Sequence, residues 1–262
     1  MEKEICIVGH GVIGQRLAQE FEQLEVKSID KYRTDLASSY EEDIAQSYDY
    51  AFICVPTQSL PDGSCNISEV EDAVSRVNAK IIVIKSAVPV GTASKFAQKY
   101  GKSIVVSPEY YGVTQHSPKS PNWVTLGGSR RDCTEIAQLY YTIKEGSFRV
   151  FFTDRETAEL AKYASNAFFA LKVTFCNEMA TIGNLYGINY EELRECMVAD
   201  ERFGDKVTFV YKDKPYYDSC CLNKDVKALI HQGKGTAPLM EAICNINKER
   251  KARDPKRVSE TH

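Results

Sequence analysis

A glycine-rich turn near the N-terminus constrains the fold of this chain more than any other feature. The apolar run Ile5–Val8 leads into the segment GHGVIG (residues 9–14), and apolar residues then recur at helical spacing. A strand, a glycine turn and a helix in this order are typical of a dinucleotide-binding unit. Gly9 permits the tight turn, Gly11 lets a pyrophosphate approach the backbone, and Gly14 lets the helix pack closely on the strand.

The second expected strand, Val26–Ile29, ends at Asp30, sixteen residues after Gly14. An acidic side chain at this point accepts hydrogen bonds from an adenosine ribose, which favours NAD over NADP. Lys31 and Arg33 follow closely and moderate that preference. The candidate cofactor-binding residues are Gly9, Gly11, Val12, Ile13, Gly14, Asp30, Val55, Pro56, Thr57, Ser86 and Lys224.

The first half of the chain continues as an alternation of strands and helices. Expected strands are Tyr50–Val55, Lys80–Lys85, Ser103–Val106 and Phe148–Phe152, and expected helices are Ile67–Val77 and Gly91–Tyr100. This order predicts an α/β fold, in which a Rossmann-type doubly wound parallel sheet precedes an all-helical central or dimerisation domain. We expect a cofactor-binding domain over residues 1–153, a helical domain over 154–252 and a basic tail over 253–262.

The second half contains two candidate chemical groups. Thr157–Tyr186 is expected to form one long helix, which places Lys162 and Asn166 one turn apart on a shared face. A surface lysine beside an amide explains this pair equally well. If the segment around Ser219 opens a helix, Cys221 and Asp225 share a face, and nearby lysines and the helix dipole favour a thiolate. On spacing alone, two buried thiols at the end of a loop explain Cys220 and Cys221 better.

Composition limits the classes of function. The formal net charge of −3 gives no argument for binding nucleic acid. The sequence has neither an apolar run of membrane-spanning length nor a signal-peptide pattern, so we expect a cytoplasmic protein. The nine cysteines are scattered without Cys-x-x-Cys spacing, which predicts reduced thiols and no metal site.

An ordered set of motifs resembles the UDP-glucose/GDP-mannose dehydrogenase family over most of the chain. After the glycine turn come ICVPT from Ile53, DGSCNISEVEDAV from Asp62, KSAVPVGT from Lys85, SPEYYG from Ser107, ETAELAKYASNAFFALKVTFCNE from Glu156, DERFG from Asp200, CLNKDVKALI from Cys221 and PLMEAICNINKERK from Pro238. No single motif is decisive, but the order is highly specific.

The resemblance implies a role for each matching residue. Cys221 matches the nucleophile, Asp225 helps to activate the hydrolytic water, and Lys162 with Asn166 steadies the oxyanion. Glu109 matches a glutamate of the active-site loop, Arg202 matches an arginine that reaches the substrate of the neighbouring subunit in a homodimer, and Tyr217 lies in the expected substrate loop. The implied reaction oxidises a primary alcohol of a sugar or nucleotide sugar to a carboxylate through a thiohemiacetal and a thioester, with two hydrides passed to NAD.

The sequence departs from the family pattern in four places. Ala87 replaces a threonine, Val113 stands where a second loop glutamate is common, and residues 210–218 lack the glycines of the substrate loop. The sequence also stops soon after the helix expected at Pro238–Lys251, where relatives continue into a domain that holds the nucleotide. We therefore expect altered or slow activity. Two alternatives stay open: a two-electron dehydrogenase resembling the 3-hydroxyacid group, and a non-catalytic NAD-binding dimeric module.

Overall fold

The computed structural model describes residues 3–33, 36, 39–111, 121–144 and 146–254, which divide into two compact units. Described residues 3–60, 65–111 and 121–162 make up the first unit, and 61–64 and 163–254 the second. The first contains β1 (Ile5–Val8), α1 (Val12–Glu20), β2 (Val26–Ile29), α2 (Tyr40–Ile44), β3 (Ser47–Ile53), β4 (Gln58–Ser59), β5 (Cys65–Asn66), α3 (Ser68–Arg76), β6 (Asn78–Ile84), α4 (Thr92–Tyr100), β7 (Ile104–Val106), β8 (Trp123–Gly127), α5 (Arg130–Ile143) and β9 (Arg149–Thr153). Helix α6 (Arg155–Leu185) begins in the first unit, and the second contains the rest of it with α7 (Tyr190–Val198), α8 (Cys220–Gly233) and α9 (Pro238–Ala252).

The first unit is built on a seven-stranded sheet with the order β2-β1-β3-β6-β7-β8-β9. Its strands pair in parallel except at one point, where β8 runs antiparallel to β7. The Rossmann-type α/β fold predicted from the sequence is confirmed, and the expectation of a wholly parallel sheet is corrected at that pair. Strand order reverses between β1 and β3, and their carboxyl ends open the crevice in which such sheets bind ligands.

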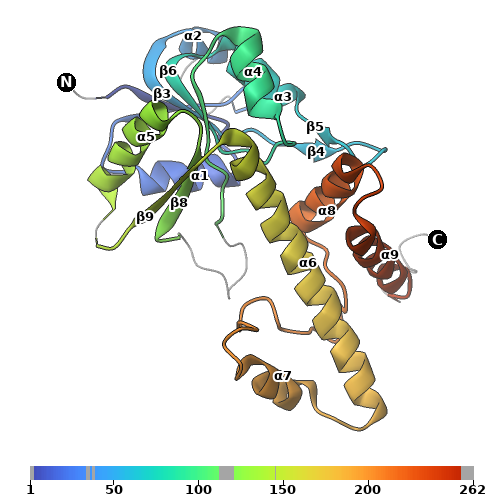
Figure 1. Ribbon diagram of the computed structural model, residues 1–262. Helices are drawn as coiled ribbons and strands as arrows, with labels where there is room; N and C mark the ends of the chain where they lie inside the picture. The colour runs from blue at the N-terminus through green and yellow to red at the C-terminus, as the bar shows by residue number, and fades with distance from the viewer. Residues whose placement is uncertain (1–2, 34–35, 37–38, 112–120, 145, 255–262) are drawn as a thin grey trace. The chain divides into compact units, whose positions relative to one another are not determined.

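Helices lie on both faces of this sheet (Figure 1), and an apolar layer fills the space beneath them on each face. On one face Leu17 and Phe21, from α1 and the turn after it, pack with Tyr140 of α5. On the other face α2, α3 and α4 pack, with Val74 and Phe96 among the buried side chains. The central strands are buried on both sides, which accounts for their continuous β-branched runs.

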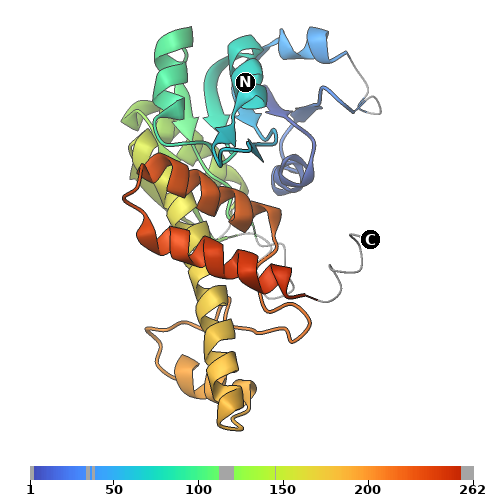
Figure 2. The same ribbon diagram turned by 90° about the vertical axis from the view of Figure 1, so that its right-hand side faces the viewer.

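The second unit has a smaller core, in which α8 and α9 lie side by side against α6 (Figure 2). Ala167 and Ala170 of α6 permit close approach, and Val226 of α8 and Ile243 of α9 fill the space between the helices. Asn247 of α9 is buried, and its side-chain amide makes two hydrogen bonds with the backbone of Tyr217. The backbone N–H of Tyr217 donates to Asn247 Oδ1 at 2.9 Å, and Asn247 Nδ2 donates to the carbonyl oxygen of Tyr217 at 3.0 Å. This pair fixes the chain just before α8. Within the described ranges, no helix has the length and apolar character needed to cross a membrane.

Candidate cofactor and catalytic sites

The glycine turn is shaped by close backbone contacts. Gly9 has a φ of +98°, and a Cβ there would lie 2.8 Å from the main chain of Cys54. A Cβ on Gly14 would lie 1.9 Å from the carbonyl oxygen of Gly9. A Cβ on Gly11, in contrast, would meet nothing within 4 Å. Two glycines therefore close the turn, and the third leaves its outer side open to a ligand.

The N-terminus of α1 lies at this open side. Gly11 is its N-cap, and no side chain caps the first turn of the helix. Val12 is exposed and Ile13 half-buried, so the backbone N–H groups of the first turn and the positive end of the helix dipole are presented together. This arrangement suits a pyrophosphate.

Asp30 joins the glycine turn to the end of β2. One carboxylate oxygen accepts a 2.7 Å hydrogen bond from the backbone N–H of His10, and the other accepts a 2.8 Å bond from that of Tyr32. The carboxylate is thereby fixed beside the turn. Each oxygen retains a lone pair, so Asp30 can still accept from a ribose hydroxyl.

The loops after β3 and β6 are tied to each other. Ser86 Oγ donates to the carbonyl oxygen of Val55 at 2.7 Å, and Thr57 Oγ1 donates to that of Ala87 at 3.1 Å. The intervening Pro56 is exposed. The predicted cofactor residues Val55, Thr57 and Ser86 therefore form one connected edge of the first unit.

A buried charged group lies in the same unit, and the sequence interpretation included only part of it. Lys85 is 5% exposed and donates to Ser107 Oγ at 3.3 Å. Burial lowers the pKa of Lys85, although the negative charges of Glu20 and Glu109 act in the opposite direction. Its signal in the sequence was a lysine ending an otherwise apolar strand.

Glu109 and Lys162 belong to this group. Burial raises the pKa of Glu109, while the positive charges of Lys162 and Lys85 oppose that rise. Glu109 Oε1 is buried without a hydrogen-bond partner. Lys162 Nζ lies 4.9 Å from the centre of the Tyr110 ring. Glu109 therefore holds its proton to a higher pH than an exposed glutamate, and one of its oxygens is available to a reacting group.

Glu159 is a second buried residue that the sequence interpretation missed. Its carboxylate accepts from the backbone N–H groups of Gly91 at 2.6 Å and Ala93 at 2.8 Å, at the start of α4. Burial raises its pKa to about 7, against the effect of those two hydrogen bonds. Glu159 thus connects α6, one turn before Lys162, to the end of the loop that follows β6.

The second unit brings Asn166, Lys224 and Asp225 together. Asn166 Nδ2 donates to one oxygen of Asp225 at 2.5 Å, and Lys224 Nζ lies 2.5 Å from the other. All three residues are buried, and Asp225 is only 1% exposed. Asp225 is thus satisfied on both oxygens, and the amide of Asn166 keeps one N–H hydrogen for another acceptor.

Cys221 is the second residue of α8, one turn before Asp225. Ser219 caps this helix by accepting from the backbone N–H of Leu222 at 3.1 Å. Cys220 and Cys221 are both exposed, which corrects the conservative alternative of two buried thiols. Lys224 is paired with Asp225, and the N-terminus of α8 is a local feature that favours a thiolate at Cys221.

The two candidate substrate residues have different surroundings. Arg202 is 91% exposed and makes its ion pair with Asp200, at 2.6 Å. Tyr217 is 4% exposed and lies in the core of the second unit, where burial raises the pKa of its phenol. Packing in this core is enough to explain the position of the Tyr217 side chain, and its contact with a substrate stays a prediction. Val113, one of the departures from the family pattern, lies outside the described residues.

Together, the Rossmann-type sheet and its glycine turn define a dinucleotide-binding protein. Sequence models of the UDP-glucose/GDP-mannose dehydrogenase family match the chain twice, with the NAD binding domain at residues 20–144 and the central domain at residues 156–249. The chain therefore belongs to that family, and NAD is the cofactor of its first domain.

Individual relatives agree with this assignment. The chain is 32% identical over 225 residues to the UDP-glucose 6-dehydrogenase of Pseudomonas aeruginosa, an alignment that covers 79% of this chain and 49% of that protein. It spans about half the length of the curated UDP-glucose 6-dehydrogenases that it matches.

Solved structures support the fold. A UDP-glucose dehydrogenase from Pyrobaculum islandicum aligns with a TM-score of 0.79 at 23% identity, covering 95% of this chain and 68% of that one. The 3-hydroxyisobutyrate dehydrogenase of Mycobacterium tuberculosis aligns with a TM-score of 0.72 at 16% identity, covering 97% and 95%. Because both chemistries occur on this fold, the fold alone does not choose between them.

Proposed function

We propose that this protein is an NAD-dependent dehydrogenase that oxidises a primary alcohol of a sugar or nucleotide sugar to a carboxylate. The observation that carries the proposal is the buried group of Asn166, Lys224 and Asp225, one helical turn from the exposed thiol of Cys221. The alternative 3-hydroxyacid reaction uses a lysine and an asparagine but needs no cysteine beside a carboxylate. This combination therefore favours the four-electron reaction.

NAD, when bound, supplies the hydride acceptor for both oxidations. The chain contributes the binding groups: the N–H groups at the start of α1 for the pyrophosphate, and the fixed carboxylate of Asp30 for the ribose. The open side of Gly11 leaves room for the phosphates.

The residues of the second unit act on the carbon that is oxidised. After the first oxidation, the sulfur of Cys221 adds to the aldehyde carbon while the thiol proton passes to the aldehyde oxygen. The resulting thiohemiacetal becomes a thioester by losing the second hydride from carbon and its hydroxyl proton to a base. Water then attacks the thioester carbonyl and the thiolate leaves. Within the second unit, the remaining N–H of Asn166 stabilises the oxyanions, and Asp225 accepts a proton from water. The family resemblance assigns Lys162 and Glu109, which belong to the first unit, to the same two tasks.

We further propose that the protein acts as a homodimer with α6 at the interface. Within the second unit, Phe168, Phe175 and Ile182 are exposed large apolar residues seven positions apart, with Leu185 one turn further on. This spacing places them on one side of a helix. A second copy of α6 would cover the stripe, and exposed Arg202 would then be available to the substrate of the partner, as the family resemblance implies.

A screen of NADH formation tests the proposed reaction. The panel contains UDP-glucose, GDP-mannose, UDP-N-acetylmannosamine and free sugars, with the native protein, Cys221→Ala and Cys220→Ala. We expect two NADH per alcohol from the native protein and from Cys220→Ala, and at most one from Cys221→Ala. Turnover of UDP-glucose should be slow, because Ala87 replaces the family threonine. One NADH per alcohol from both native protein and Cys221→Ala would support the two-electron alternative, and two NADH from Cys221→Ala would remove Cys221 from the mechanism. NAD binding with no turnover of any alcohol would support the non-catalytic one.

A further inference from the structure

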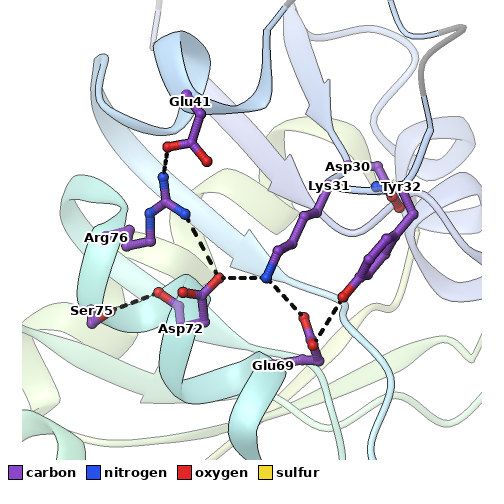
Figure 3. Close-up of polar contacts among 8 residues, drawn as sticks. All are labelled: Asp30, Lys31, Tyr32, Glu41, Glu69, Asp72, Ser75 and Arg76. Atoms are coloured by element: carbon purple, nitrogen blue, oxygen red, sulfur yellow. Dashed lines mark hydrogen bonds and ion pairs between the residues drawn. The ribbon is translucent and has the colours of Figure 1, made fainter.

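Lys31 lies immediately after Asp30 and is a cation that a cofactor bearing a 2′-phosphate could use. Its side chain, however, extends toward α3 (Figure 3). Lys31 Nζ lies 3.5 Å from Asp72 Oδ2 and 3.9 Å from Glu69 Oε2, both on the first turns of that helix. The two carboxylates raise the pKa of Lys31, so the lysine is charged at neutral pH and attracted to them.

Neighbouring contacts hold the two carboxylates where Lys31 meets them. Tyr32 donates its phenolic hydrogen to Glu69 Oε1 at 3.1 Å. Asp72 also faces Arg76, whose guanidinium is paired with Glu41 (Figure 3). Each exposed ion pair is weak alone, but several charges with fixed geometry act as a network. The position of Lys31 is therefore set by α3.

The net charge of this network is negative. Asp30 is fixed by the backbone N–H groups of His10 and Tyr32. The ionised side chains drawn in Figure 3 are four carboxylates and two cations, namely Asp30, Glu41, Glu69, Asp72, Lys31 and Arg76. A ribose hydroxyl can donate a hydrogen bond to these carboxylates, whereas their negative charge repels a 2′-phosphate.

We propose that Glu69 and Asp72 are specificity-determining residues that exclude NADP by holding Lys31 on α3. The proposal rests on the proposed function only in taking the glycine turn as the NAD site. The two carboxylates act in two ways: they hold Lys31, the cation next to Asp30 in the sequence, and they add negative charge near the end of β2. The NAD preference is therefore shared between Asp30 and two residues on the following helix.

Titration calorimetry of NAD⁺ and NADP⁺ with the full chain tests the proposal. The variant Glu69→Gln/Asp72→Asn keeps the side-chain shapes and frees Lys31. We expect its affinity for NADP⁺ to rise about tenfold while its affinity for NAD⁺ changes less than about twofold. Adding Lys31→Ala to this variant should remove the gain. Adenosine 2′,5′-bisphosphate and ADP, as probes without nicotinamide, should give the same ranking.

A matched control separates local from long-range charge. Glu71 pairs with Lys99, and Glu135 pairs with Lys80. Glu71→Gln/Glu135→Gln thus removes the same number of negative charges from ion pairs that do not involve Lys31, and we expect no gain for NADP⁺. An unchanged NADP⁺ affinity in the Glu69/Asp72 variant, an equal gain in the control, or a gain that survives Lys31→Ala would each overturn the proposal while leaving NAD binding intact. An absence of NAD⁺ binding by the native protein would instead overturn the proposed function, and this proposal with it.

Discussion

The two units build their candidate sites from different parts of the chain. In the first unit the cofactor groups are mostly backbone: the N–H groups of α1 and glycines that leave no room for a Cβ. In the second unit they are buried side chains, Asn166, Lys224 and Asp225, carried by two helices. The first site is therefore sensitive to added volume, and the second to removed charge.

The largest effect should follow removal of charge in the second unit. Asp225→Asn leaves Lys224 buried without its counter-ion, and breaking a buried pair in this way costs about 3–5 kcal/mol. Chemical denaturation measures the loss. Asp205→Asn, at an exposed pair with Lys206, is the control and should change stability by less than about 0.5 kcal/mol. If both variants lost only a small and similar amount of stability, the second site would not depend on its buried charges.

The pH dependence of stability should reveal the buried carboxyl of Glu159. Its pKa is raised from 4.5 to about 7 in the folded protein, so folding favours the protonated form. Its stabilising contribution is complete below pH 4.5 and is lost as pH rises through 7, a loss of about 3 kcal/mol. Glu159→Gln does not ionise and should lack this fall. Parallel stability profiles for native protein and variant between pH 5 and 8 would show that the carboxyl is not perturbed.

Added volume should distinguish two glycines of the same turn. Gly14→Ala places a Cβ against the carbonyl of Gly9 and should cost about 1–3 kcal/mol. Gly11→Ala meets nothing within 4 Å and should leave the melting temperature unchanged, while weakening NAD⁺ binding through bulk on the open side. Thermal melts and NAD⁺ titrations of both variants make the test. Loss of stability in Gly11→Ala, or none in Gly14→Ala, would mean that the turn is shaped differently.

The smallest effect concerns association through the exposed stripe of α6. Phe175→Glu places a charge in the middle of the stripe and should convert a dimer to a monomer without lowering the stability of the second unit's core. Light scattering at micromolar concentration measures this. A native protein that is monomeric would remove Arg202 from the candidate site.

Local patterns predicted the first unit well. Strands Ile5–Val8 and Val26–Ile29 were placed at their observed bounds, because Gly9 and Asp30 mark where each strand ends. Helix α5 was missed, although Ser129 caps it by accepting from Asp132 and the buried Ile136 and Tyr140 recur at helical spacing. The short α2, β4 and β5 and the antiparallel β8 were missed too, since pairing direction depends on contacts distant in sequence.

For the candidate sites, the sequence predicted shared helix faces but not the contacts between distant residues. The i,i+4 spacing of Cys221 and Asp225 predicted their shared helix face, and α8 begins where that required. No local pattern indicated that Asp225 would bond Asn166, 59 residues earlier, or that Lys224 would pair with Asp225 instead of serving the thiol. Glu159 was missed for the same reason, because its partners lie on α4.

Intact-mass spectrometry after rapid quenching tests the central claim, that Cys221 forms a covalent intermediate with the oxidised substrate. Native protein, Cys221→Ala and Cys220→Ala are each incubated with NAD⁺ and the nucleotide sugars of the screen. We predict an added mass equal to that of the substrate less the hydrogens lost in two oxidations, on native protein and Cys220→Ala only, with peptide mapping that places it on Cys221. NADH formation with no adduct on the native protein at any quench time, or an adduct that persists in Cys221→Ala, would contradict the account.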